Sequence, residues 1–228
     1  MPTPTEKIWD HERQRRNRKL ERASSALGAS QRDKVVSSDL AVQLLEAVLE
    51  PGDRVCLEGN NQKQADFLAQ ALTRVNPARV NKLHMLQSVL ALPEHLDLYE
   101  LGIAEQVDFS FSGPQAARLA RMVGKKQIRI GAIHTYLELF SRYFVDLTPH
   151  VALVAAQSAD AQGNLYTGPN TEDTPAIVEA TAFKNGIVIA QVNELVDKVP
   201  RVDIPGDWVN FVIQIGRASC RERVWYYV

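Results

Sequence analysis

The stretch Glu58-Gly59-Asn60-Asn61-Gln62 has the residue types of a loop that binds an anion. It follows an apolar run at residues 55–57, which predicts a buried strand, and precedes a helical pattern at residues 67–75. Backbone N–H groups at such a junction lie at the carboxyl edge of a sheet and suit an anion or a developing oxyanion. In the plain alternative, Gly59 relieves strain and the asparagines cap the helix, with Asn61 and Gln64 at capping-box spacing. Spacing alone leaves both interpretations open.

Histidines and a second glycine junction are the next candidates. A predicted strand at residues 107–111 ends at Ser112-Gly113-Pro114, and Gly113 could face the same cleft as Gly59. His134 could act in acid–base chemistry, but the sequence places no carboxylate to orient it, which favours a hydrogen-bonded structural role. His84 and His95 have no spaced acidic or cysteine partners, so we expect them in packing or surface positions.

Acidic residues near two predicted element ends complete the set. Thr171-Glu172-Asp173-Thr174 precedes a proline that can begin a helix, so capping and dipole stabilisation account for Asp173 and Thr174. Glu172 could additionally line a cleft. Glu194 ends a predicted strand at residues 187–192, where its type would suit a nucleophile, but we do not assign it that role.

The elements that position these residues alternate between strand and helix. Strands at 151–154 and 187–192 flank a helix at 174–185, which predicts a parallel, right-handed βαβ unit. Further strands are predicted at 55–57, 82–87, 107–111 and 127–130. This alternation predicts a three-layer α/β/α domain with a mainly parallel sheet. The aromatic stripe of the helix at 136–144 is expected in the core.

Composition excludes several classes of protein. With 26 basic and 27 acidic residues the net charge is −1, so no global field favours nucleic acid or a membrane. No apolar run reaches the length of a membrane helix, and the N-terminal residues carry charges where a signal peptide needs an apolar core, so we expect the cytoplasm as the default location. The two cysteines, Cys56 and Cys220, provide neither a disulfide framework nor a metal site.

Three segments are expected along the chain. Residues 1–34 are polar and basic, and predict a solvated helix or frayed end, or else an arm that docks onto sister subunits. Residues 35–214 form the main domain. Residues 215–228 resemble a translated sequencing adapter, so we expect a non-native tail there and exclude it from the fold.

Several ordered motifs resemble known families. Asp160-x-x-Gly163-Asn164-Leu165 and Ile204-Pro205-Gly206 are similar to the first half of class I coenzyme A transferases. A closer resemblance, to the α subunits of malonate decarboxylase, covers about residues 35 to 213. It is carried by residues 57–68 (LEGNNQKQADFL), 109–115 (FSFSGPQ), 131–136 (GAIHTY) and 168–175 (GPNTEDTP).

The resemblance implies a fold, a site and a reaction. Coenzyme A transferases place their acyl-thioester-binding loop at the position of residues 58–62, usually with several glycines, whereas this loop has only Gly59. An intact α subunit would exchange acetyl for malonate on an acyl carrier protein and release acetate. It would bind no cofactor directly, since the carrier protein bears the phosphoribosyl-dephospho-coenzyme A arm. The family's nucleophilic glutamate belongs to the second half, so no catalytic residue is expected here.

Two alternatives remain open at this point. The first is half of a citrate lyase α subunit or of another coenzyme A transferase, which would share the mechanism but not the acyl acceptor. The second is a non-catalytic module that docks the carrier protein or other decarboxylase subunits. Members of the resembling family would continue for about as long again, so we expect this chain to be a first half and inactive alone.

Overall fold

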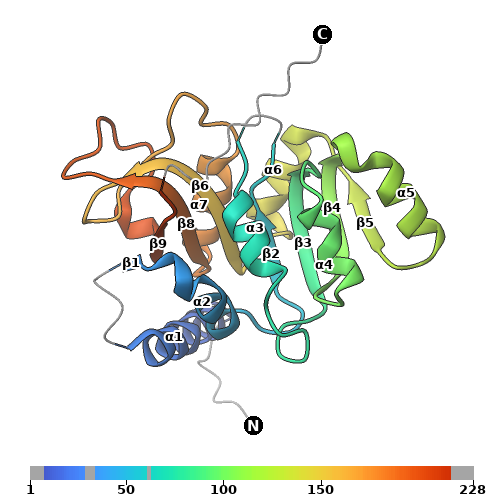
Figure 1. Cartoon of the computed structure of the whole chain (residues 1–228), viewed down its shortest axis with the longest axis horizontal. Helices are drawn as coiled ribbons and strands as arrows, with labels where there is room; N and C mark the ends of the chain where they lie inside the picture. Colours follow the sequence, from blue (N-terminus) through green and yellow to red (C-terminus); the bar gives the residue numbers. More distant parts are fainter. Residues whose placement is uncertain (1–7, 29–33, 61–62, 217–228) are drawn as a thin grey trace.

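The computed structural model describes residues 8–28, 34–60 and 63–216, which form a mainly parallel sheet with helices on both faces (Figure 1). Within these residues the strands are β1 Val35–Val36, β2 Arg54–Leu57, β3 Leu83–Val89, β4 Ala104–Phe111, β5 Arg129–Ile133, β6 Val151–Ala159, β7 Leu165–Tyr166, β8 Ile187–Leu195 and β9 Phe211–Gln214. The helices are α1 Ile8–Leu27, α2 Ala41–Val48, α3 Asp66–Leu72, α4 Glu94–Glu100, α5 Ala116–Gly124, α6 Tyr136–Val145 and α7 Thr174–Phe183. Short 3-10 segments are η2 Ser38–Leu40, η3 Gly113–Gln115 and η4 Gly206–Trp208.

The strand order creates a topological switch point between β2 and β6. The order is β1-β9-β8-β6-β2-β3-β4-β5, with neighbours parallel, and β7 pairs antiparallel with β6. After β2 the chain adds β3, β4 and β5 on one side, and β6 then returns to the other side of β2. Open α/β sheets bind ligands outside the carboxyl ends of the strands at such a point. A ligand site is therefore expected at the carboxyl ends of β2 and β6.

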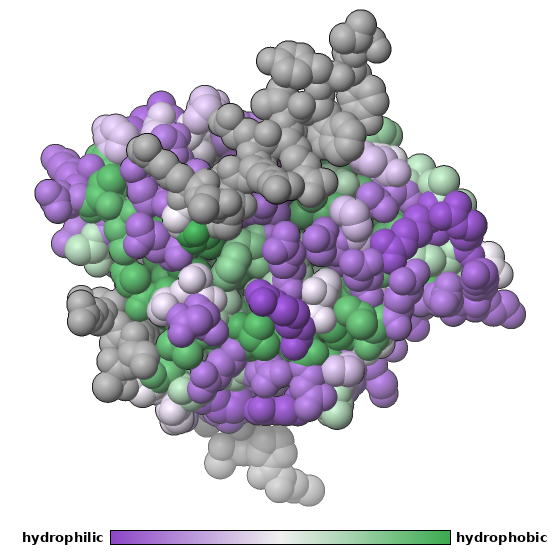
Figure 2. All heavy atoms as spheres, viewed as in Figure 1, coloured by the Kyte–Doolittle hydropathy of each residue, from purple (hydrophilic) through white to green (hydrophobic). Residues whose placement is uncertain are grey.

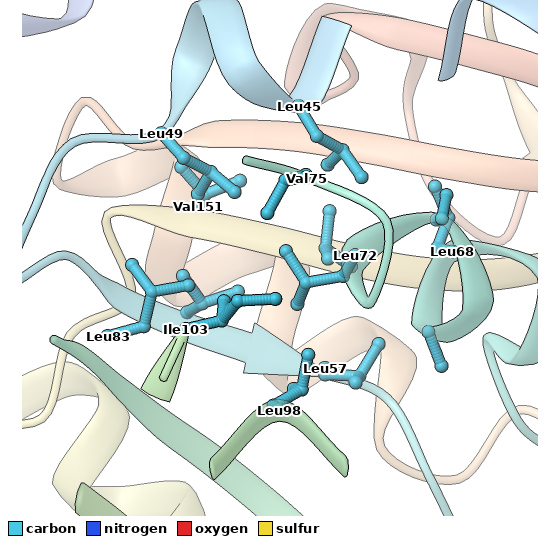
Figure 3. Packing of buried hydrophobic residues seen from close by; sticks show 14 of the residues in the cluster. Leu45, Leu49, Leu57, Leu68, Leu72, Val75, Leu83, Leu98, Ile103 and Val151 are labelled. Carbon is cyan, nitrogen blue, oxygen red and sulfur yellow. The ribbon is translucent and has the colours of Figure 1, made fainter. Parts of the chain in front are cut away.

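Alternating side chains of the central strands fill two cores, one on each face of the sheet. β6 is apolar almost throughout, as expected of a strand buried on both faces. On one face, α2 and α3 contribute Leu45 and Leu72 to a cluster that includes Leu57 of β2 (Figure 3). On the other face, α6 and α7 contribute Tyr143 and Ile177. The predicted three-layer α/β/α fold is confirmed.

The βαβ unit expected around β6, α7 and β8 is also confirmed. β6 and β8 pair in parallel, from Val151 opposite Ile187 to Ala159 opposite Leu195. The other predicted strands and helices are present, with ends shifted by a few residues. β1, β7 and β9 were not predicted as strands: β1 and β7 have only two residues each and give no periodic signal, and β9, although as long as β2, was missed.

Helix α6 is only partly in the core, contrary to expectation. Leu139 and Tyr143 are buried, but Leu137 is 82% exposed and Val145 is 77% exposed. A helix in an outer layer turns one side to the sheet, whereas α6 is apolar on both sides. Ile133, at the end of the edge strand β5, is also apolar and 65% exposed.

Helix α1 packs on the domain, which corrects the expectation of a solvated or frayed end. Its residues Ala23 and Leu27 are buried in the core beside α2. Lys19 is also buried, and its Nζ lies 2.5 Å from Oδ2 of Asp53. The sequence of the arm alone did not indicate this, because the acidic partner is 34 residues away.

Apolar and polar residues alternate in small patches on the face shown in Figure 2. Among the described residues, none of the helices combines the length and apolar character needed to cross a membrane. Ile215, assigned above to the tail, donates its N–H to the Val192 carbonyl at 2.9 Å. Residues 1–7 and 29–33 of the expected arm and 217–228 of the expected tail lie outside the described residues.

Candidate functional site at the switch point

A tight hairpin directly follows β2 at the switch point. Gly59 and Gln64 form an antiparallel bridge, closed by hydrogen bonds from Ala65 N–H to Glu58 O (2.9 Å) and from Asn60 N–H to Lys63 O (3.0 Å). We call the described residues Gly59, Asn60, Lys63 and Gln64 the β2–α3 hairpin. Asn61 and Gln62, which the sequence analysis assigned to the same site, lie outside the described residues. The hairpin stands at the carboxyl edge of the sheet, as predicted.

Asn60 shapes this hairpin. Its side chain is only 2% exposed, and its Oδ1 accepts the Lys63 N–H at 2.7 Å. The Asn60 carbonyl accepts Nε2 of Gln64 at 2.9 Å. An asparagine that bonds its own backbone in this way mimics a turn. Asn60 therefore stabilises the conformation of the loop.

The start of α3 is not an open anion site, which corrects the physical basis of the prediction. The Phe67 N–H donates to Oδ1 of Asp66 at 2.8 Å, and the Leu68 N–H donates to Oε1 of Gln191 at 3.0 Å. The helix begins at Asp66 with no side-chain cap, so the Asn61–Gln64 capping box is wrong. Within the described residues, the two hairpin hydrogen bonds use the N–H groups of Asn60 and Ala65, and the N–H groups of Gly59 and Gln64 take no part in them.

Gly59 is required by close packing. A Cβ at this position would lie 2.5 Å from Cε1 of His95 and 3.2 Å from the Val89 carbonyl. The Gly59 carbonyl accepts the Val89 N–H at 2.9 Å. Gly113 lies against the same Val89, with a positive φ of 51°. Both glycines thus lie against Val89 at the end of β3, and whether they face the same cleft stays a prediction.

A buried polar cluster supports the hairpin from below. The Glu58 carboxylate accepts the Ala155 N–H of β6 at 2.7 Å, accepts the Thr174 hydroxyl, and lies 3.3 Å from Nζ of Lys63. Lys63 also donates to the Thr174 hydroxyl oxygen. Burial raises the pKa of Glu58, although Lys63 and the Ala155 N–H oppose that shift. Glu58 is 1% exposed, so it connects β2, β6 and α7 and does not line an open cleft.

Asp173 and Ser88 extend this cluster across the sheet. The Ser88 hydroxyl of β3 contacts both Oδ2 of Asp173 and, at 3.3 Å, the Gly59 carbonyl. Burial raises the pKa of Asp173 to about 6, with the Glu58 and Glu172 charges adding to the effect. Asp173 occupies the N-cap position of α7, but its side chain makes no capping hydrogen bond and the Thr174 hydroxyl bonds Glu58, which corrects the capping interpretation.

The sequence analysis missed Ser88 and the role of Lys63. Gln87-Ser88 is a polar pair inside an otherwise apolar strand, which is a signal that could have marked Ser88. Lys63 lies in the segment 57–68, which resembles malonate decarboxylase α subunits, but no chemical role was predicted for it. Its partner Thr174 is 111 residues away, so spacing could not reveal the contact.

His134 belongs to a second polar cluster, on β3, β4 and the start of α6. Oδ1 of Asp108 lies 2.8 Å from Nε2 of His134, and Oδ2 of Asp108 lies 2.6 Å from Nε2 of His84. Burial alone would raise the pKa of Asp108, but the hydrogen bonds from His84 and His134 lower it to about 2. His134 therefore has an orienting carboxylate and His84 an acidic partner, both against expectation. The hydrogen-bonded structural role favoured for His134 fits this arrangement.

The remaining predicted residues lie near the hairpin or along the same edge. Glu172 is exposed, with a φ of +24°, and precedes Asp173. Glu194 is half-buried in β8, opposite Ser158 of β6. Whether Glu172, Glu194 or Gly113 lines a substrate cleft stays a prediction. Within the described residues, no group of histidine, cysteine and acidic side chains is arranged to hold a metal ion.

Comparison with solved structures defines the class of protein first. Glutaconate coenzyme A-transferase from Acidaminococcus fermentans superposes with a TM-score of 0.64 at 12% identity, covering 80% of this chain and 76% of that chain. At this identity the likeness shows the fold alone. The fold is that of coenzyme A transferases, in agreement with the expectation.

The family follows from closer matches. A family model described as "Malonate decarboxylase, alpha subunit, transporter" matches residues 8–225, and the chain belongs to this family. "Acetyl-S-ACP:malonate ACP transferase" of Malonomonas rubra is 56% identical over 209 residues, which are 92% of this chain and 37% of that protein. The malonate decarboxylase hetero-tetramer of Pseudomonas, solved with malonate, gives a TM-score of 0.86 at 53% identity, covering 93% of this chain and 38% of that one. The citrate lyase and general coenzyme A transferase alternatives are therefore not retained.

Proposed function

We propose that this chain supplies the thioester-binding part of an acetyl-S-acyl-carrier-protein:malonate transferase. That is the reaction named for the Malonomonas rubra relative, of which the chain spans 37%. In this reaction malonate replaces acetate on the carrier thioester, giving malonyl-S-carrier and free acetate. The proposal concerns what these residues contribute to a complete α subunit.

The observation that supports the proposal most is the position of the β2–α3 hairpin. It follows β2 at the switch point, where sheets of this type bind ligands. Attack on a thioester carbonyl creates an oxyanion, which fixed N–H donors stabilise more strongly than they do the ground state. The N–H groups of Gly59 and Gln64 would fill this role. The Lys63 side chain, 11% exposed, adds positive charge for an anionic acyl group.

Partners and cofactor follow from the same proposal. The acyl carrier protein would present its prosthetic group, and we expect a phosphoribosyl-dephospho-coenzyme A arm. The other decarboxylase subunits would bind the complete α subunit, as the hetero-tetramer of the Pseudomonas relative suggests. The attacking carboxylate would come from outside this chain. We place the complex in the cytoplasm.

The test replaces Asn60 in the complete α subunit. Asn60→Ala removes the acceptor of the Lys63 N–H and should lower malonyl-carrier formation about tenfold while the subunit remains folded, since one lost hydrogen bond to a loop can misplace its donors. Asn60→Ser keeps a shorter side-chain acceptor for the same N–H without adding a charge, and serves as the matched control. It should retain most of the activity. Thioester transfer is measured by mass spectrometry of the carrier, and folding by circular dichroism.

The outcomes distinguish between different roles of the hairpin. Equal losses in both variants would mean that Nδ2 of Asn60 itself contacts the oxyanion. Full activity in Asn60→Ala would remove the hairpin from the mechanism. This chain assayed alone should form no malonyl-carrier, and detectable product would contradict the absence of a nucleophile here.

A further inference from the structure

A single hydroxyl proton serves two acceptors beneath the hairpin. Ser88 Oγ contacts Oδ2 of Asp173, and it lies 3.3 Å from the carbonyl oxygen of Gly59. The Gly59 carbonyl also accepts the Val89 N–H at 2.9 Å, so the serine would be its second donor. Ser88 and Asp173 are each 3% exposed, so water does not readily substitute for either. A serine hydroxyl carries one proton and can donate to one of these acceptors at a time.

The protonation state of Asp173 decides which acceptor that is. An ionised carboxylate only accepts, so it takes the Ser88 proton and leaves Gly59 with Val89 alone. A protonated carboxyl donates to Ser88 Oγ, and the serine proton is then available to the Gly59 carbonyl. No atom other than hydrogen needs to move far between the two arrangements.

Burial, together with the surrounding charges, brings the pKa of Asp173 close to the physiological range. Burial raises the pKa of Asp173 to about 6, Glu58 and Glu172 add to the shift, and Ser88 and Lys63 oppose it. Because Glu58 and Asp173 are close and share one nearby cation, their protons are coupled. The titratable and charged groups that face Asp173 are Glu58, Lys63, Glu172, Cys56, Tyr136 and Tyr143.

We propose that Asp173 and Ser88 are positioning residues that hold the β2–α3 hairpin through the Gly59 carbonyl when Asp173 is protonated, and loosen it when Asp173 is ionised. A bound anionic acyl group would favour the protonated form, because added negative charge disfavours a second carboxylate. Substrate binding and tightening of the hairpin would then promote each other. This last step rests on the proposed function, whereas the hydrogen-bond exchange does not.

The test follows hydrogen exchange of the hairpin segment in the complete α subunit by mass spectrometry. In the natural protein, protection of this segment should fall about threefold between about pH 5 and about pH 7.5, after correction for intrinsic exchange, because one hydrogen bond is lost. Asp173→Asn can donate to Ser88 at every pH, so protection should stay high throughout. Ser88→Ala should give low protection throughout, and Ser88→Thr, which keeps the hydroxyl, should restore the pH dependence.

Kinetics distinguish this inference from the proposed function. The kcat/KM of transfer should decrease as pH rises through about 6, and this decrease should be absent in Asp173→Asn and Ser88→Ala. Protection that depends on pH equally in Ser88→Ala and the natural protein would overturn the inference. If the natural subunit shows the expected exchange pattern but no transfer, the proposed function is wrong and the hydrogen-bond exchange still stands.

Discussion

Gly59 makes two structural contacts, of which the approach to His95 requires glycine. Its carbonyl is fixed by Val89 at the end of β3, and its Cα hydrogens face the ring of His95. His95 is fully buried, and burial lowers its pKa to about 3, so the ring is neutral and acts as packing. The glycine therefore sets the distance between the hairpin and α4. This explains a single glycine here without requiring a ligand.

Gly59→Ala should lower the free energy of unfolding by about 1–3 kcal/mol, because the new Cβ would lie 2.5 Å from Cε1 of His95. Urea denaturation of the chain followed by circular dichroism measures the change. Gly124→Ala is the control, since nothing lies within 4 Å of a Cβ there and it closes helix α5. It should be neutral or stabilise by up to about 1 kcal/mol. Equal stabilities for the two variants would contradict the packing role of Gly59.

Residue roles were predicted well where the partner is local and poorly where it is not. The position of Gly59 beside a strand end was predictable from a few neighbouring residues. The His84–Asp108 contact was not, because it joins adjacent strands whose register the sequence does not reveal. Glu138 lies four residues after His134, at helical spacing, and its carboxylate is 3.2 Å from Nδ1. That signal was available and was overlooked.

At the scale of elements, helix α1 is bound to the sheet by one buried charge cluster. Asp53 lies just before β2, and its carboxylate is 2.5 Å from Nζ of Lys19 and 2.5 Å from a guanidinium nitrogen of Arg15, both on α1. It is also 3.1 Å from Nδ1 of His150. Burial alone would raise the pKa of Asp53, but His150, Lys19 and Arg15 together hold it below its ordinary value. A carboxyl with a lowered folded pKa stabilises the fold above its unfolded pKa. That contribution is lost as pH falls toward the folded pKa.

Lys19→Met should lower the free energy of unfolding by about 2–3 kcal/mol, since it removes a charged hydrogen bond to a buried carboxylate and keeps similar volume. Arg18→Met, at an exposed position of the same helix, should change stability by less than about 0.5 kcal/mol. Urea denaturation gives both values, and hydrogen exchange should show faster exchange of α1 in the first variant only. A Lys19→Met protein as stable as the natural one would mean that desolvation cancels the pair.

The longer elements were predictable because β6 is a nearly continuous apolar run and because Pro175 and Asn185-Gly186 mark the two ends of α7. The start of α3 was predicted wrongly, since a hairpin occupies the residues that looked like a capping box. A bridge between Gly59 and Gln64 depends on β6 and α7 packing against it through Glu58. Local spacing carries no information about such support.

At the scale of the whole molecule, the surface of α6 and β5 is unusual because several large apolar side chains are exposed on it. Ile133 of β5 and Leu137 and Val145 of α6 are each more than 60% exposed, and Phe144, next to Val145 in α6, is 38% exposed. Exposed apolar patches of this kind promote association. The three-layer fold was predictable from the alternation of elements, but which helix side faces solvent was not, because α6 is apolar on both sides.

The chain is expected to self-associate, and Leu137→Lys together with Val145→Lys should weaken that association about tenfold by interrupting the apolar surface. Sedimentation equilibrium over a range of concentrations measures the effect. Phe183→Lys is the matched control, since Phe183 is 76% exposed but lies at the end of α7. If the control weakens association equally, the surface on α6 and β5 is not responsible.

The strand order also governs how the polypeptide can acquire its structure during synthesis. β2 emerges from the ribosome early, yet one of its two edges is paired only by β6, after β3, β4, β5 and α6 have been made. Until Val151–Ala159 arrives, that edge exposes free backbone groups, which are prone to pairing with other chains. The Glu58 carboxylate that later receives the Ala155 N–H is without that donor in the same interval. The polar cluster under the hairpin can therefore form only late, when the nascent chain joins its two half-sheets.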